Sequence, residues 1–197
     1  MRAGNEDEVG RKLLVNDADL IGRLSQAFRE HGFEGASLAI LSRETGLKKA
    51  SLYHRFPGGK EQMAQEVLES TRTWLEENVL AALRSDAAPK ARIALMIRKL
   101  DGLYAGGRQA CILNLLSATG VRDGPFAGLV RDIFTAWING IAGALVEAGL
   151  EPAVARRRAE RAVTAIQGAL VLSHGLGDTR CFRDVLRELP DELLGAG

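Results

Sequence analysis

The sequence predicts an all-α protein, with a small N-terminal helical domain followed by a larger helical domain. Apolar side chains recur every three to four residues along almost the whole chain, and Gly or Pro separates the successive runs. No segment alternates apolar and polar residues in the way that a half-buried strand does. We therefore expect a flexible arm at residues 1–16, a first domain at 17–59 and a second domain at 60–197.

The first helix is predicted at residues 17–31. Its apolar positions fall at helical spacing and are Leu20, Ile21, Leu24, Ala27 and Phe28. Asp17 suits the N-cap, because its side chain can accept a hydrogen bond from a free backbone N–H. Gly32 suits the C-terminal stop, because glycine adopts the left-handed backbone conformation that ends many helices.

Two shorter helices are predicted next. Ser37 is a suitable N-cap for a helix at 38–45, and Gly46 breaks that helix. A third helix runs from about residue 48 to 55, before Pro57-Gly58-Gly59 ends it. Three short helices in this space predict a compact unit with a thin core.

The second domain is predicted to begin with one long uninterrupted helix at 60–84. Pro89 opens the next helix, because a proline at the first helical position loses no hydrogen bond. A short apolar helix follows around 111–118, and a longer one spans 126–148. Two further helices are expected, one after Pro152 and one after Asp178.

The charge distribution favours a local nucleic-acid site over a general coat of positive charge. The 197-residue chain has 26% charged residues and a formal net charge of only +1. Between Arg29 and Lys60, however, six cations stand against three anions. A local basic excess on a nearly neutral protein is typical of a discrete nucleic-acid site.

The composition argues against several other classes of protein. The two cysteines, Cys111 and Cys181, are too few and too far apart for a disulfide framework or a metal site. No apolar run approaches the roughly 18 residues of a membrane-spanning helix. Acidic residues stand near the N-terminus, where a signal peptide has its apolar core. We expect a cytoplasmic protein with no cofactor, no metal and no membrane partner.

The segment 46–60, GLKKASLYHRFPGGK, carries the chemistry of a DNA-reading helix. Cations, hydroxyls and an aromatic tip follow a glycine turn, and Leu52 and Phe56 anchor the helix. A helix, a glycine-containing turn and a second helix form a helix-turn-helix, whose second helix enters the major groove of DNA. Many proteins contain such a helix pair, so this pattern alone is a weak indication.

The spacing of residues from Phe28 to Lys60 closely resembles the TetR family of bacterial repressors. The matching positions are Phe28, Gly32-Phe33, Ser37, Leu41, Gly46-Leu47, Ser51-Leu52-Tyr53 and Phe56. The Phe-Pro-Gly-Gly-Lys ending is similar to the subgroup of drug- and flavonoid-responsive repressors like LmrA and YxaF. This motif covers about a fifth of the chain, and the all-helical remainder agrees with the family.

The resemblance implies a set of DNA contacts: Ser37, Lys48, Lys49, Ala50, Ser51, Tyr53, His54 and Lys60. Lys49 can reach guanine or a phosphate, and Ala50 is small enough to touch a thymine methyl. Ser37 and Lys60 stand at helix starts, where free N–H groups attract phosphate. For Tyr53 a packing role stays open, as does an ordinary solvated surface for the lysine pair.

Lys48 and Ala50 depart from the family pattern, which usually has Ser and Gly at these positions. The Ser normally caps the recognition helix, so we expect this cap to be missing, at a cost of about 1 kcal/mol. Lys48 also places a cation near the positive end of a helix. We expect a DNA phosphate to hold Lys48 in the complex and to offset that cost.

The resemblance also implies a dimer and a small-molecule cavity in the second domain. The last two helices are expected to form the dimer interface, although the same residues suit an internal core: Ala159, Val163, Ile166, Leu170, Phe182, Val185 and Leu186. The middle helices are expected to surround the cavity, with Met96, Tyr104, Cys111, Asn114, Phe134, Trp137 and Gln167 as candidates. Few charged residues occupy inward positions, which favours a lipophilic or aromatic effector.

Together these observations predict a repressor that binds a palindromic DNA operator as a homodimer and that a small lipophilic or aromatic molecule releases. A DNA-binding regulator with no effector is the alternative. A remote alternative is an enzyme with Cys111 as nucleophile and His174 as base. No orienting third group or motif supports that pair, and isolated Cys and His residues on apolar helices usually belong to the core. We therefore do not expect an enzyme.

Overall fold

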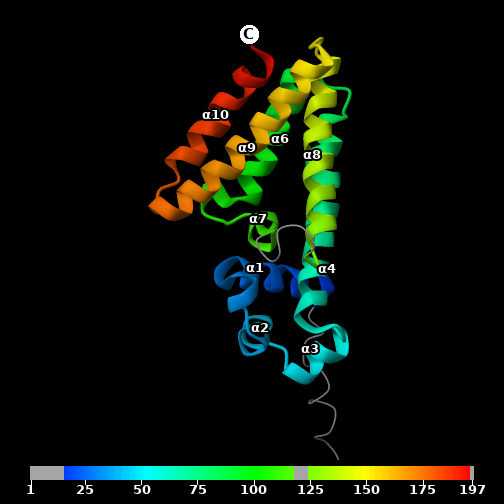
Figure 1. Cartoon of the computed structure of the whole chain (residues 1–197), viewed down its shortest axis with the longest axis vertical. Helices are drawn as coiled ribbons and strands as arrows, with labels where there is room; N and C mark the ends of the chain where they lie inside the picture. Colours follow the sequence, from blue (N-terminus) through cyan, green and yellow to red (C-terminus); the bar gives the residue numbers. More distant parts are fainter. Residues whose placement is uncertain (1–15, 118–123, 196–197) are drawn as a thin grey trace, which may run out of the picture.

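The computed structural model describes residues 16–117 and 124–195, and every regular element in these ranges is helical (Figure 1). The all-α prediction is therefore confirmed for the described part of the chain. Apart from Asn16, the predicted arm at 1–16 lies outside it, as does residue 118 at the end of one predicted helix.

The first three helices are α1 (Asp17–Gly35), α2 (Leu38–Thr45) and α3 (Lys49–Arg55). Asn16, and not Asp17, is the N-cap of α1, because its side chain accepts a hydrogen bond from the Ala18 N–H at 3.3 Å. Gly32 interrupts the regular helix with a φ of 66°, but the chain resumes helical geometry as far as Gly35. The predicted stop at Gly32 is therefore a kink.

The core of this N-terminal head is small and well packed. Leu24, Phe28, Leu41, Leu52 and Phe56 are each fully buried between the helices. The head core continues without a break into the core of the remaining helices. The two predicted domains consequently share one hydrophobic core. A shift of the helices in one domain can therefore be transmitted to the other domain through packed side chains.

The long helix after the head contains a change of helical type. It consists of α4 (Gly59–Leu75), a π-helical turn (Glu76–Leu80) and α5 (Ala81–Leu83). The prediction of one uninterrupted helix is therefore wrong at the π turn. A Cβ atom on Gly140 would lie 2.5 Å from Leu80 Cδ2, so helix α8 passes this turn at very close range. A π turn contains one extra residue, which rotates the side chains that follow it about the helix axis.

The second domain continues with α6 (Pro89–Leu103), a 3₁₀ turn (Ala105–Gly107), α7 (Ile112–Ser117), α8 (Ala127–Glu147), α9 (Pro152–Leu176) and α10 (Arg180–Leu194). Pro89 and Pro152 occupy first helical positions as predicted. Helix α8 runs beside α4, while α9 lies between α8 and α10 (Figure 1). The short α7 lies between the head and this bundle and contacts α1.

Helix α8 is long and apolar enough, by length and composition, to cross a membrane. The expectation that no segment approaches this length is therefore wrong for α8. Core helices of soluble proteins pass the same test, and α8 buries a stripe that includes Ile133, Trp137 and Ile141. However, only 33% of the residues in the most apolar 18-residue stretch of α8 are buried. Helix α8 therefore also has apolar side chains that the rest of the protomer does not fully cover.

The residues predicted for the dimer interface lie inside the protomer. Six of the seven are buried, namely Ala159, Val163, Ile166, Leu170, Phe182 and Leu186, and Val185 is partly buried. Helices α9 and α10 pack against each other along their length. The alternative of an internal core therefore holds for these residues, because a buried side chain offers little surface to a partner.

Candidate nucleic-acid interface

The turn between α2 and α3 is fixed by a network of hydrogen bonds. Gly46 takes the left-handed conformation with a φ of 73°, as predicted for the break. The buried Thr45 hydroxyl donates to the Leu41 carbonyl at 2.6 Å and accepts from the Leu47 N–H at 3.4 Å. Arg23 of α1 donates to the Thr45 carbonyl at 3.3 Å. This network fixes the position of α3 relative to the rest of the head.

Helix α3 begins without a side-chain cap. Lys48 has the extended backbone of an N-cap residue, with φ −66° and ψ 149°, but its side chain makes no capping hydrogen bond. The predicted loss of the cap is therefore confirmed. Because Lys48 is exposed, its ammonium group lies in solvent near the start of α3.

The outward face of α3 is polar and continuous. Its exposed side chains are Lys48, Lys49, Ala50, Ser51, Tyr53 and His54. Leu52 and Phe56 are fully buried and anchor the helix to the head. Tyr53 is 52% exposed, which makes it one of the most exposed large hydrophobic side chains in the described residues. We call these six exposed residues the α3 face.

Ser37 and Lys60, the two predicted backbone clamps, differ in their surroundings. Ser37 is exposed and caps α2, since its hydroxyl accepts from the Ile40 N–H at 3.3 Å. The Lys60 ammonium group instead donates to the Phe33 carbonyl at 2.8 Å and lies 4.4 Å from the centre of the Phe33 ring. Lys60 therefore ties the start of α4 to the end of α1, and its role at a phosphate stays a prediction.

Arg55 is also engaged within the head. Its guanidinium forms a two-pronged hydrogen bond with the Glu66 carboxylate, at 2.9 and 3.2 Å, and a longer one of 3.4 Å with Asp17. The hydrogen bonds to Glu66 raise the pKa of Arg55 above its usual value. Arg55 consequently links α3 to α4 and α1, and the α3 face depends on its lysines for positive charge.

Three residues that hold the interface were missed from the sequence. Thr45 and Arg23 lock the turn as described, and the Ser42 hydroxyl donates to the Leu47 carbonyl at 2.6 Å. The available indication was the pair of short hydroxyl side chains just before Gly46, because such side chains often bond to nearby backbone groups. Arg23 gave no such indication, since its partner is 22 residues away.

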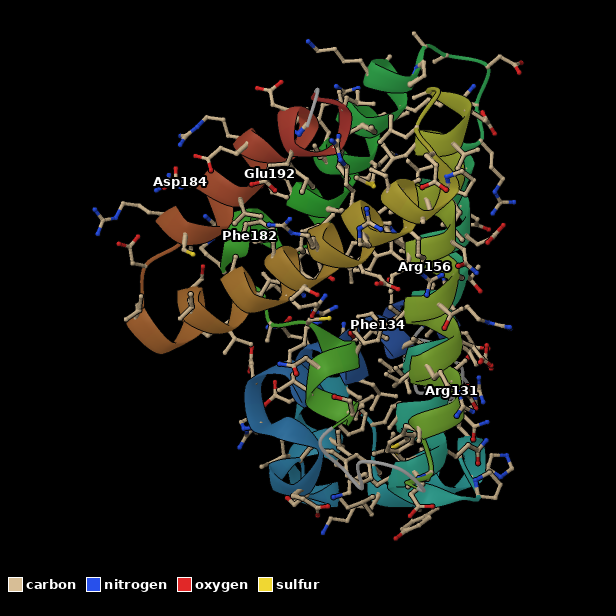
Figure 2. All side chains as sticks on the ribbon, turned by 45° about the horizontal axis from the view of Figure 1, so that its top comes forward. Arg131, Phe134, Arg156, Phe182, Asp184 and Glu192 are labelled. Carbon is tan, nitrogen blue, oxygen red and sulfur yellow. The ribbon has the colours of Figure 1, made fainter. Side chains whose placement is uncertain are left out.

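The residues predicted to line an effector cavity are mostly interior. Met96, Tyr104, Cys111 and Trp137 are buried, and Phe134 and Gln167 are partly buried. Asn114 is exposed on α7, which contradicts the prediction that it faces the interior. Figure 2 places Phe134 of α8 and Phe182 of α10 on opposite sides of α9.

Several polar groups in this interior lack a hydrogen-bond partner within the described residues. They are Trp137 Nε1, Ser173 Oγ and both amide atoms of Gln167. The Tyr104 hydroxyl donates to Cys111 Sγ at 3.5 Å. Burial raises the pKa of Tyr104 well above its usual value, and the neighbouring Cys111 thiol raises it further. Tyr104 therefore stays protonated and able to donate.

Cys111 and His174 do not form the nucleophile and base of the remote alternative. The buried Cys111 thiol contacts the Tyr104 hydroxyl, whereas His174 is exposed on α9 and lines a cavity beside α1. No hydrogen bond joins the two residues in the part of the chain that the structure describes. The arrangement needed for thiol activation is therefore not assembled.

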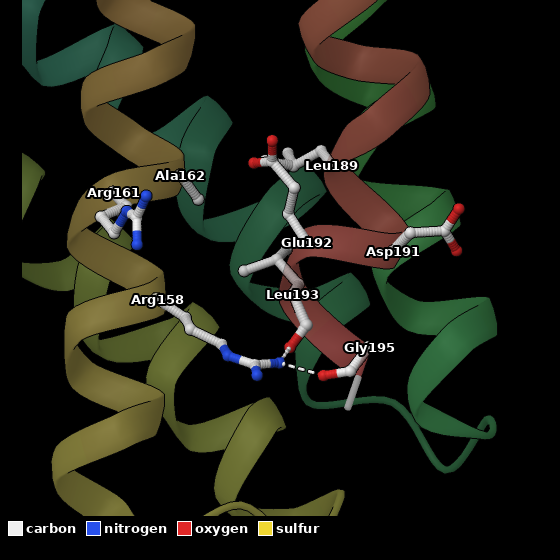
Figure 3. Close-up of a pocket in the computed structure, with 8 residues that line it drawn as sticks. All are labelled: Arg158, Arg161, Ala162, Leu189, Asp191, Glu192, Leu193 and Gly195. Atoms are coloured by element: carbon white, nitrogen blue, oxygen red, sulfur yellow. Dashed lines mark hydrogen bonds between the residues drawn. The ribbon is translucent and has the colours of Figure 1, made fainter. Parts of the chain in front are cut away.

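A groove between α9 and α10 holds a further cluster of charged residues (Figure 3). The Arg158 guanidinium crosses from α9 and donates to the Leu193 and Gly195 carbonyls at the end of α10, at 2.9 and 2.7 Å. A cation at a helix C-terminus stabilises the free carbonyls there. Arg158 thus fastens α10 to α9, which fits the internal packing of these two helices.

Comparison with known proteins matches each of the two domains to a family of transcriptional regulators. Residues 24–67 match the family "Bacterial regulatory proteins, tetR family", and residues 88–188 match "Transcriptional regulator LmrA/YxaF-like, C-terminal domain". The HTH-type transcriptional regulator LmrA of Bacillus subtilis is 22% identical over 157 residues, which cover 78% of this chain and 84% of LmrA.

Solved structures share the fold at low sequence identity. SCO4454, a TetR-family transcriptional regulator from Streptomyces coelicolor, has a TM-score of 0.75 and 20% identity, over 90% of this chain and 93% of that chain. The transcriptional regulator FadR from Bacillus subtilis, in complex with stearoyl-CoA, has a TM-score of 0.65 and 17% identity, over 90% of this chain and 99% of that chain. The match to the LmrA/YxaF-like domain spans just over half of the residues. The chain therefore belongs to the TetR family of bacterial transcriptional regulators and has a C-terminal domain of the LmrA/YxaF-like type.

Proposed function

We propose that this regulator is a ligand-responsive repressor, which binds a palindromic operator as a homodimer and leaves it when a small molecule binds the second domain. The observation that carries the proposal is the α3 face, an exposed polar surface on a helix locked in place by the Thr45 network. Such a regulator would act in the cytoplasm, where it meets double-stranded DNA.

The α3 face has the chemistry for both base reading and phosphate binding. Lys49 lies in the first turn of α3, where a helix in the major groove meets base edges. Ala50 beside it leaves room for a thymine methyl. Ser51, Tyr53 and His54 supply hydroxyl and ring N–H groups for phosphates. Lys48 and the exposed Ser37 extend the phosphate contacts beyond α3, while Lys60 supports them from inside the head.

The outward face of α8 and α9 is the surface that we assign to the dimer. A groove there is lined by Phe134 and Ile138 of α8 and by Gly168 and Val171 of α9. Val171 is 53% exposed in the protomer, and a Cβ on Gly168 would meet no atom within 4 Å. The apolar surface that α8 leaves uncovered belongs to the same helix pair. A second copy of the chain would bury this surface, because a two-fold axis pairs it with itself.

The effector site that we propose lies at the unpaired polar groups of the second domain. Buried polar groups without partners are costly, and a bound molecule with a hydrogen-bond acceptor and donor would satisfy Trp137 and Gln167. The buried side chains of the second domain, such as Met96, are largely apolar, which favours a lipophilic or aromatic body. FadR, which shares the fold, is bound to stearoyl-CoA, a molecule with a long apolar chain.

Release of DNA by a ligand is the experiment that tests this function. Aromatic and lipophilic compounds are screened for a rise in melting temperature, and each hit is titrated into the complex with a DNA fragment that the protein selects from random sequence. We expect at least one hit to release the DNA. Gln167 also lines the groove assigned to the dimer. Gln167→Leu should therefore weaken that hit about tenfold while the protein stays dimeric in sedimentation, whereas Gln65→Leu on the exposed side of α4 should change neither. If no stabilising compound releases DNA, the regulator works without an effector of this class.

A further inference from the structure

A second cavity lies where the head meets the second domain. Its volume is about 500 Å³, and α1, the linker between α6 and α7, and α9 supply its walls. The polar side chains that line it include Arg29 of α1, Arg108 and Gln109 of the linker, and His174 of α9. This cavity is separate from Met96, Trp137 and Gln167, which do not line it.

Arg29 carries a positive charge into this cavity without a carboxylate to balance it. Its guanidinium donates to the Ser25 hydroxyl at 3.3 Å and to the Ala110 carbonyl. With the Gln109 amide turned so that both its atoms are satisfied, the amide oxygen also accepts from Arg29 Nε at 3.3 Å. All of these partners are neutral, and no ion pair to Arg29 occurs within residues 16–117 and 124–195. Partial burial accordingly lowers the pKa of Arg29 from its usual value.

The charges around the cavity are matched to a single negative charge. Arg108 adds a second guanidinium on an exposed part of the linker. Glu30 is the one carboxylate among the lining residues, and the Gln26 amide already binds it at 2.6 Å. Two guanidinium groups and one carboxylate leave the lining with one net positive charge, which a bound monoanion neutralises. Glu30 would repel a dianion more strongly than a monoanion. Guanidinium groups fit a carboxylate with two parallel hydrogen bonds.

The linker that forms one wall has an unusual backbone. Ala105 has a φ of 49°, and it is the non-glycine residue with positive φ in the described part of the chain. Gly106 and Gly107 follow with φ values of 66° and 90°. A left-handed alanine costs roughly 1–2 kcal/mol, and strained residues of this kind cluster at ligand-binding segments and switches.

We propose that this cavity binds a small organic monocarboxylate, with Arg29 and Arg108 as the groups that hold its carboxylate. The charge without a counter-ion and the net charge of the lining both point to this class of ligand. The site is additional to the effector site proposed above. Because Arg29 belongs to α1 and Arg108 to the second domain, the bound anion would contact both domains at their joint.

The test compares each carboxylate with its uncharged counterpart on the purified protein. Aliphatic and aromatic monocarboxylates, their primary amides and inorganic phosphate are titrated while the melting temperature is followed. At about a hundred times Kd, a bound carboxylate should raise the melting temperature by roughly 5–10 °C. Its amide should raise it far less. Arg108→Gln and Arg29→Gln should each weaken binding at least about tenfold, whereas Arg98→Gln, at an exposed position of α6, should leave it unchanged.

Several outcomes would overturn the proposal. They are the absence of any carboxylate that binds, equal binding by an amide, or binding that survives Arg108→Gln. Stronger binding of inorganic phosphate would also overturn the assignment to a monoanion. Arg108→Gln decides the case if Arg29→Gln does not fold, because it leaves the bond between Arg29 and Ala110 intact. No DNA enters the assay, so its result is independent of the proposed repressor function.

Discussion

Replacing Lys48 by Ser should make the protein more stable and its DNA complex weaker. Lys48 already has the backbone of an N-cap residue, with φ −66° and ψ 149°, but it lacks a capping side chain. A serine hydroxyl at this position can accept from a free N–H of the first turn, which contributes about 1 kcal/mol. Removing a cation from the positive end of a helix adds about 0.3–1 kcal/mol. The free energy of unfolding should therefore rise by about 1.3–2 kcal/mol.

The stability half of this prediction is measured by thermal unfolding. For a chain of this size each kcal/mol shifts the melting temperature by about 2–4 °C, so Lys48→Ser should raise it by roughly 3–8 °C. Lys49→Ser is the matched control, because it also removes a lysine from the start of α3 but stands inside the helix and cannot cap it. An equal gain from Lys49→Ser would show that charge alone, and not the cap, sets the effect.

The DNA half is measured by operator binding at several salt concentrations. Each lost phosphate contact lowers the slope of log affinity against log salt by about 0.9, and a dimer loses two, so the slope should fall by about 1.8. Lys90→Ser, at an exposed position of α6, should leave the slope unchanged. If Lys48→Ser binds DNA with unchanged affinity and slope, then Lys48 does not contact phosphate and the reasoning is refuted.

Four further predictions concern the second domain. Gly107→Ala should destabilise the protein by about 2–4 kcal/mol in chemical denaturation, because φ is 90° and the new Cβ would lie 2.9 Å from a neighbouring side chain. Gly102→Ala in α6, where a Cβ meets no atom within 4 Å, should stabilise it by about 1 kcal/mol. Val171→Asp should give monomers in sedimentation, whereas Ser70→Asp on α4 should remain dimeric. Since burial raises the pKa of Tyr104 in the folded state, stability should fall as pH rises above about 10, and Tyr104→Phe should lessen that fall.

The features of the head that are local in sequence could be predicted from it. Ser37 caps the helix that follows it, Gly46 makes the turn, and Lys48 leaves α3 uncapped, because each depends on a few neighbouring residues. The hydrogen bond of Lys60 could not be predicted in the same way. Its partner, the Phe33 carbonyl, is 27 residues away in the sequence and lies in the last turn of α1, where carbonyl groups lack partners within the helix.

The surface that we propose for the dimer could not be predicted from the pattern of apolar residues. Ala159 and Ile166 face the protomer's own core, and Val171 faces outward, yet all three are apolar residues on α9. Periodicity shows which side chains avoid water and does not show what covers them. The π turn at Glu76–Leu80 was not predicted either, because the apolar spacing of this segment does not distinguish a π turn from an α-helix.

Selection of bound sequences from random DNA tests the central claim most directly, because it asks whether the α3 face reads bases as part of a symmetric dimer. The account predicts a palindromic site whose half-site centres are about 34–36 Å apart, or a multiple of that distance. It also predicts that Lys49→Ala, at the start of α3, changes the preferred bases or abolishes enrichment. No enrichment, or a site without two-fold symmetry that Lys49→Ala leaves unchanged, would contradict the account.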